Sequence, residues 1–98
     1  MINSKALQMI ELLSSTTDYI SQETLSYKLS VKPRTLREIL RVYKEEIEKD
    51  GSCSILYKNN YGYLLEIQDK DIFAMYLETQ KEELRKEHET KLKNVREE

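Results

Sequence analysis

Two predicted helices, over residues 22–29 and 33–49, are separated by only three residues, and this spacing constrains the fold more than any other feature. Ser21 can cap the first helix, and Pro33 stands at the first position of the second, where proline is best tolerated. Val31 is the single apolar side chain in the turn between them. A short turn of this kind between two helices is typical of a helix-turn-helix.

Two strand-like segments follow the helix pair. Residues 53–58 and 61–67 are rich in Ile, Leu and Tyr, and the second segment alternates between two faces. Asn59-Asn60 between them tolerates the left-handed backbone that a tight hairpin requires. A further helix, over residues 2–13, is predicted before the pair. Three helices followed by a hairpin predict an α+β winged helix-turn-helix.

The composition changes after residue 67, so that residues 1–67 form the predicted domain and residues 68–98 a charged helical extension. Asp69 can cap a helix there, and opposite charges four residues apart support it. The extension is expected to serve as a linker or as a dimerisation arm between two copies of the chain, although a purely solvated helix is an alternative. An apolar seam along it would comprise Phe73, Tyr76, Leu77 and Leu84.

The composition excludes several classes of function. Cys53 is the only cysteine, so no internal disulfide can form, and His88 is the only histidine, which leaves no His/Cys set with zinc-ligand spacing. Two glycines cannot make a glycine-rich phosphate loop, and no apolar run approaches the roughly 20 residues of a membrane span. We therefore expect a cytoplasmic protein that has no catalytic activity, no cofactor, no metal and no membrane contact.

The charges are distributed unevenly along the chain. The net charge is −2, yet residues 28–44 carry six basic side chains against one acidic side chain. Residues 69–98 carry seven basic side chains against nine acidic ones. A phosphate backbone responds to a local basic patch rather than to the total charge. The basic segment therefore favours double-stranded DNA as the partner.

The third predicted helix has two distinct faces at about 100° per residue. Its apolar residues fall within about 60° of one another: Leu36, Leu40, Tyr43 and Ile47. Its charged residues lie on the opposite side or on the flank of that side: Arg34, Arg37, Glu38, Arg41 and Glu45. In a helix-turn-helix, the N-terminal residues of this helix enter the major groove, where arginine can contact guanine and a carboxylate can accept from cytosine.

These residue types suggest individual roles on DNA. The three arginines are candidates for contacts with bases or phosphates, and Glu38 could read a cytosine or only orient its arginine neighbours. Lys32 and Thr35 are better placed for the phosphate backbone, which fixes the register of the protein on the duplex. The alternative is a solvated helix whose opposite charges pair at i, i+4.

Two further segments could hold the phosphate backbone. The hairpin turn offers basic and amide side chains for phosphate or for the minor groove: Lys58, Asn59, Asn60 and Tyr61. Ser21 and Gln22 lie at the positive end of a predicted helix, where backbone N–H groups can bind a phosphate. Each segment also has a purely structural interpretation, because asparagines suit a turn without DNA and Ser21 could act only as a cap.

Residues 20–37, which end in Val31-x-x-Arg34-Thr35-Leu36-Arg37, and Gly62-Tyr63 in the hairpin carry a resemblance to a known family. Together they resemble the N-terminal winged-helix domain of bacterial transcription regulators. The most similar are activators of sugar-uptake operons that carry phosphotransferase-regulated (PRD) domains, and Mga-like virulence regulators. The resemblance covers residues 5–67 and implies sequence-specific binding of double-stranded DNA, with contacts from Arg34, Thr35 and Arg37.

Three positions depart from the family pattern. Lys32 stands where a capping serine is common, so the third helix has a weaker start. Glu38 replaces a residue that is commonly basic, which alters the expected base preference. Asn60 replaces a wing glycine, which is tolerable because asparagine also adopts the left-handed backbone. Family members continue into sensory domains, so we expect a fragment of a longer regulator or an isolated DNA-binding module. A winged-helix module that binds a protein is the alternative.

Overall fold

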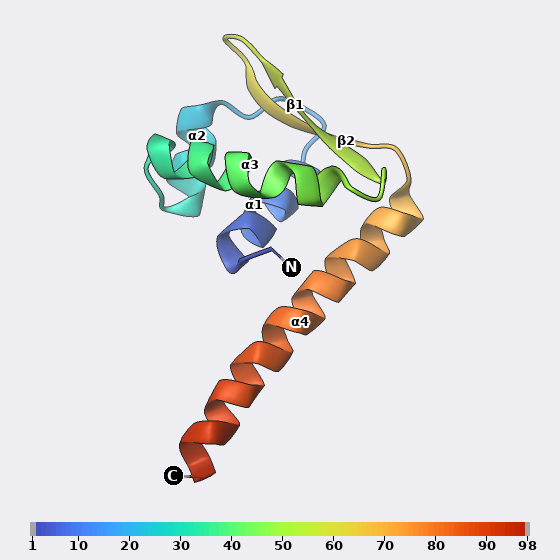
Figure 1. Cartoon of the computed structure of the whole chain (residues 1–98). Helices are drawn as coiled ribbons and strands as arrows, with labels where there is room; N and C mark the ends of the chain where they lie inside the picture. The colour runs from blue at the N-terminus through green and yellow to red at the C-terminus, as the bar shows by residue number, and fades with distance from the viewer. Residues whose placement is uncertain (1, 98) are drawn as a thin grey trace.

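The computed structural model describes residues 2–97, with side chains described for residues 2–86 (Figure 1). Over this range the chain forms four helices and a two-stranded antiparallel sheet, so the predicted α+β class is confirmed. The helices and strands follow in the order α1 (Ser4–Ser14), α2 (Gln22–Leu29), α3 (Pro33–Glu48), β1 (Cys53–Lys58), β2 (Gly62–Ile67) and α4 (Lys70–Glu97). The side chain of His88 lies outside the described residues.

Capping residues fix the beginning of most of these helices. The side chains of Asn3, Ser21 and Asp69 each accept a hydrogen bond from an N–H in the first turn of α1, α2 and α4, at 2.8, 3.1 and 3.0 Å. Lys32 precedes α3 and makes no capping hydrogen bond through its side chain, and Pro33 opens the helix. The predicted weak start of α3 is therefore confirmed.

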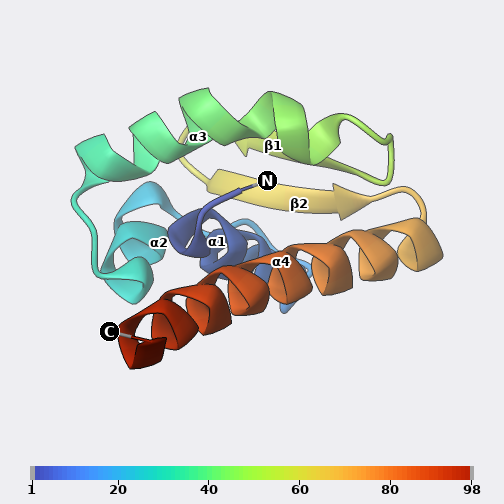
Figure 2. The same cartoon turned by 60° about the horizontal axis from the view of Figure 1, so that its bottom comes forward.

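Helix α1 lies at the centre of the molecule, between α3 and α4 (Figure 2). The core around it draws on every helix and on both strands: Ile2, Ala6, Leu7, Met9, Ile10, Leu13, Leu25, Leu29, Leu36, Ile39, Leu40, Ile47, Cys53, Ile55, Leu65 and Phe73. The predicted apolar stripe of α3 packs on this core: Leu36, Leu40 and Ile47 are buried, and Tyr43 is half-buried against it. Ile39, which the predicted stripe did not include, is also buried.

The hairpin is joined to the start of α2 by a short bridge. Strands β1 and β2 pair in register from Cys53↔Ile67 to Lys58↔Gly62, and Ile20 and Tyr63 exchange two backbone N–H···O bonds of 2.8 Å. Gly62 has φ +107°, and a Cβ at this position would lie 2.1 Å from the carbonyl oxygen of Ile20. Only glycine allows this close approach, which holds the hairpin against α2.

The hairpin turn differs slightly from the prediction. Tyr61 was expected to open the second strand, but it belongs to the turn and donates its N–H to the carbonyl oxygen of Lys58 at 3.0 Å. Asn60 has φ +71°, in the left-handed region that was predicted for this position. The extra turn residue places Gly62, rather than Tyr61, at the point where β2 meets the segment before α2.

Helix α4 packs against this chain's own core in its first half. Phe73 is buried, and the other residues of the predicted seam, Tyr76, Leu77 and Leu84, are half-buried against the same core. Gln80 is buried and accepts a hydrogen bond of 3.0 Å from the N–H of Ile2. The seam thus covers the domain rather than lying free for a second copy. The part of the predicted extension beyond residue 86 lies outside the described side chains.

Backbone hydrogen bonds tie the start of α4 to the loop between α3 and β1. The N–H groups of Gln68 and Asp69 both donate to the carbonyl oxygen of Ser52, at 2.8 and 3.1 Å. Ser52 is fully buried and directly precedes β1. The end of β2, the start of β1 and the first turn of α4 therefore meet at one residue.

Candidate nucleic-acid interface

The predicted contact residues of α3 lie on its solvent-facing side. Leu36, Ile39, Leu40 and Ile47 are buried in the core, whereas Val42 is exposed. Five predicted contact residues are also exposed: Arg34, Thr35, Arg37, Glu38 and Arg41. Lys32, just before the helix, is also exposed. None of the three arginine side chains is covered by the rest of the described chain, so the guanidinium groups are accessible to a partner.

The charges on this face are partly paired within the helix. Glu38 accepts a hydrogen bond from Arg41 Nε at 3.2 Å and forms an ion pair with the terminal guanidinium nitrogen of the same arginine. That hydrogen bond lowers the pKa of the Glu38 carboxyl below its ordinary value. Glu38 therefore orients Arg41, which is one of the two roles predicted for it. Within residues 2–86, Arg34 and Arg37 take part in no ion pair.

A groove of about 390 Å³ lies between α3 and the hairpin, and we call it the α3–hairpin groove. It is lined by residues from α2, α3, β1 and β2: Gln22, Arg37, Leu40, Lys44, Ile55, Tyr57 and Tyr63. Leu40 and Ile55 are buried, so the floor is apolar, whereas Arg37 and Lys44 carry charge. The groove brings together two residues that were predicted separately, Arg37 on α3 and Gln22 on α2.

The walls of the groove are held by specific contacts. Lys44 Nζ donates to one carboxylate oxygen of Glu48 at 2.9 Å, and the N–H of Ile55 donates to the other at 2.7 Å, which ties α3 to β1. Partial burial raises the pKa of Glu48, but these two hydrogen bonds outweigh it and leave the pKa below its ordinary value. Glu48 therefore stays ionised and neutralises Lys44.

Two tyrosines form the hairpin side of the groove. The rings of Tyr57 and Tyr63 lie 5.0 Å apart between centroids and are tilted by 51°. Burial raises the pKa of the Tyr63 hydroxyl, and the nearby guanidinium of Arg37 opposes that shift. The two residues differ in exposure, since Tyr63 is half-buried and Tyr57 is 59% exposed. Tyr57 thus leaves more than half of its surface exposed to solvent on the hairpin side of the groove.

The hairpin turn lies beside the start of α2, so the two further segments predicted to hold the phosphate backbone are neighbours. Ser21, Gln22, Asn59, Asn60 and Tyr61 line one shallow depression there, together with Glu23, Tyr57 and Gly62. The hydroxyl of Ser21 is already engaged, because it caps α2 and donates to the Thr24 hydroxyl at 2.8 Å. The Lys58 ammonium lies 4.6 Å from the centroid of the Tyr61 ring. Glu23 adds an acidic group at this end.

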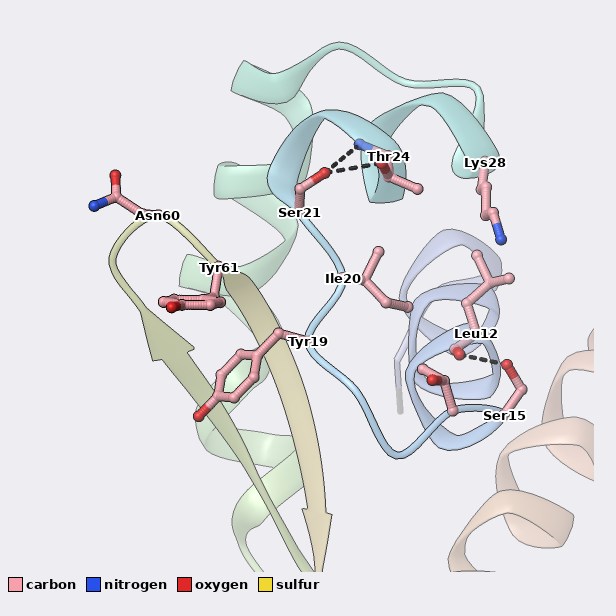
Figure 3. A pocket seen from close by; sticks show the side chains of 10 residues that line it. Leu12, Ser15, Tyr19, Ile20, Ser21, Thr24, Lys28, Asn60 and Tyr61 are labelled. Carbon is pink, nitrogen blue, oxygen red and sulfur yellow. Dashed lines mark hydrogen bonds between the residues drawn. The ribbon is translucent and has the colours of Figure 1, made fainter.

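A second, more polar pocket opens on the other flank of α2 (Figure 3). Its volume is about 460 Å³, and the rings of Tyr19 and Tyr61 lie 6.3 Å apart on one side of it, while Lys28 lies on the other. Hydroxyl groups from α2 and from the segment that connects α1 to α2 supply much of the remaining lining: Ser15, Thr16, Ser21 and Thr24. This pocket shares Ser21, Asn60 and Tyr61 with the predicted interface.

Sequence reasoning missed Tyr57 as part of the interface. Tyr57 lies on β1, where the burial of the side chains decreases toward the turn. The signal that could have revealed it is its position, since Tyr57 lies only two residues before Asn59, where a hairpin projects from the domain.

No protein-family model, curated protein or solved structure matches this chain. Among the described residues, no group of three or more His, Cys, Asp or Glu side chains is arranged to hold a metal ion. The same part of the chain contains no helix with both the length and the apolar character needed to cross a membrane.

Proposed function

We propose that this chain is a winged-helix domain that binds double-stranded DNA in a sequence-specific way. The observation that carries the proposal is the gathering of three elements around the α3–hairpin groove. Helix α3 supplies Arg37, the start of α2 supplies Gln22, and the hairpin supplies Tyr57. The arginine face of α3 continues from this groove onto the open surface with Arg34.

The arrangement of the elements supports the winged-helix assignment. The chain runs through α1, the Ile20 bridge, α2, α3 and then the hairpin, and β2 pairs with Ile20 just before α2. In Figure 1 the hairpin lies alongside α3, with its turn projecting beyond the helices. In a helix-turn-helix docked on DNA, the second helix of the pair enters the major groove, which here would be α3. The hairpin would then be the wing.

The charge of the interface supports a nucleic-acid partner. Arg34 and Arg37 are exposed cations without an internal ion pair in residues 2–86, so a phosphate or a base would not need to displace a carboxylate. Arg41 is hydrogen-bonded to Glu38, so it would have to give up that contact to bind DNA. The planar guanidinium of arginine can donate two parallel hydrogen bonds, either to the acceptors of guanine or to the oxygens of a phosphate.

The sequence resemblance of residues 5–67 supports a proposed biological setting. It supports a cytoplasmic bacterial transcription regulator, in which this domain acts on the promoter of a sugar-uptake or related operon. Nothing in the proposed binding mode requires a second copy of the chain. A homodimer through residues 69–98 stays a prediction that sedimentation of the protein at several concentrations can test.

The experiment begins with selection from a pool of random duplexes at a stated salt concentration. We expect enrichment of one sequence family, and fluorescence anisotropy with the enriched duplex should then give an affinity that falls steeply with salt. The slope should be roughly 0.9 per neutralised phosphate in a log–log plot. Arg34→Ala should weaken binding, whereas Arg85→Ala should not, because Arg85 lies on α4 away from the groove.

The comparison of these two variants separates the proposal from its alternative. Both remove one exposed arginine, so the change in net charge is the same. Equal affinities of the two variants, together with no enriched sequence, would contradict DNA recognition through α3. That result would favour the alternative in which the domain binds a protein.

A further inference from the structure

We propose, building on the proposed function, that the α3–hairpin groove binds a single phosphate of the DNA backbone through Arg37 and the Tyr57 hydroxyl. On this proposal Arg37 positions the duplex without reading its sequence, and Arg34 on the outer face reads the bases. The sequence left both roles open for each arginine, and it did not include Tyr57 among the contacts.

The charge of the groove points to an anion. Among the described residues, none of those that line it is acidic. Lys44 is neutralised by Glu48 at 2.9 Å, whereas Arg37 has no carboxylate partner in residues 2–86. Arg37 is therefore the uncompensated cation of the groove, and an anion that enters meets its guanidinium first.

The surroundings of Arg37 strengthen such a contact. Leu40 and Ile55 are buried beneath the groove and lower the local dielectric, which makes a charged hydrogen bond stronger than it would be in open solvent. Gln22 and Tyr57 add an amide and a hydroxyl that can donate to further oxygens of the same phosphate. One anion could thus be held from three elements at once, α2, α3 and β1.

The position of Arg37 around the helix separates it from the other two arginines. At about 100° per residue, Arg41 lies about 20° from Arg34, whereas Arg37 lies about 60° from Arg34 and about 40° from Arg41, on the side toward the hairpin. When α3 lies in the major groove, Arg34 and Arg41 face the base pairs. A side chain on the flank faces the wall of the groove, which is the phosphate backbone.

The test compares arginine variants on the selected duplex and on a panel of duplexes that each carry one base substitution. Arg37→Ala should weaken binding to every duplex by the same factor, about 10- to 100-fold, as expected for loss of a charged hydrogen bond. It should also reduce the salt slope by about 0.9. Arg34→Ala should change the ratio of affinities between duplexes. A change of base preference in Arg37→Ala, or an unchanged salt slope, would overturn the proposal.

Two further measurements test the phosphate site itself. Replacing single phosphates by neutral methylphosphonates should reveal one position that weakens binding of the unmodified protein but has no further effect on Arg37→Ala. Tyr57→Phe should weaken binding about threefold, while Tyr27→Phe should leave it unchanged, because Tyr27 is an exposed tyrosine on α2 outside the groove. The site would be refuted if every methylphosphonate weakened binding of Arg37→Ala as much as it weakens binding of the unmodified protein. Equal affinities of Tyr57→Phe and Tyr27→Phe would also refute it. Failure of the unmodified protein to bind any duplex would instead refute the proposed function.

Discussion

Replacement of Gly62 by alanine tests the joint between the hairpin and α2. A Cβ at Gly62 would lie 2.1 Å from the carbonyl oxygen of Ile20 and 2.6 Å from the Cα of Ser21. Both are backbone atoms, so the segment before α2 has to move away from β2. This movement breaks the two N–H···O bonds of 2.8 Å between Ile20 and Tyr63. The φ of +107° is itself unfavourable for alanine.

The magnitude can be estimated from these terms. Strain at a backbone conformation that favours glycine costs about 1–3 kcal/mol, and each lost hydrogen bond costs about 0.5–1.5 kcal/mol. We expect Gly62→Ala to lower the free energy of unfolding by about 4 kcal/mol. For a domain of this size that corresponds to a drop in Tm of about 20 °C or more.

Gly51 supplies a matched control for this experiment. It also has a positive φ, +75°, but a Cβ there would meet no atom within 4 Å. Gly51→Ala therefore carries the backbone strain without the clash, and we expect a loss of about 1 kcal/mol. Thermal unfolding followed by circular dichroism at 222 nm compares the two variants. Equal losses of Tm would refute the argument that the close approach to Ile20 holds the hairpin in place.

Two further predictions concern α4. Gln80→Ala should lower the free energy of unfolding by about 1–3 kcal/mol, because it leaves the buried N–H of Ile2 without its acceptor. Glu78→Ala, on the exposed side of α4, should change the free energy of unfolding little. Urea unfolding of the two variants tests this difference. Burial raises the pKa of Tyr76 from 10.0 to about 12, so its contribution to stability is complete below pH 10 and is lost as the pH rises toward 12. Tyr76→Phe should flatten the decline of stability between pH 10 and 12. The variant should not destabilise the protein at pH 7, because the Tyr76 hydroxyl has no hydrogen-bond partner among the described residues. A Tyr76→Phe variant that keeps the alkaline decline would contradict this explanation.

The features that were predicted correctly are encoded by nearby residues. Ser21 and Asp69 cap helices through atoms three residues away, Pro33 fixes the start of α3, and Asn60 adopts the left-handed turn. Each of these depends on side-chain chemistry within one turn of the chain. Local pattern was therefore sufficient to place the helix pair and the hairpin.

The features that were missed depend on contacts between residues that are far apart in the sequence. The pairing of Ile20 with Tyr63 joins residues that are 43 positions apart, and no local preference indicates it. The seam of α4 was assigned to a partner or to solvent, but Gln80 and its apolar neighbours pack on the domain because α4 turns back past α1. The α3–hairpin groove exists only after such packing, which is why Tyr57 was not recognised as part of it.

The contact of Ser52 with the start of α4 joins two parts of the fold at a single backbone atom. One carbonyl oxygen receives the N–H groups of Gln68 and Asp69, so the start of α4 is attached at the base of the hairpin, close to the end of α3. Gln80 attaches the same helix to Ile2, just before α1. A substitution that shifts the Ser52 carbonyl would therefore disturb the start of α4 and the base of the hairpin together.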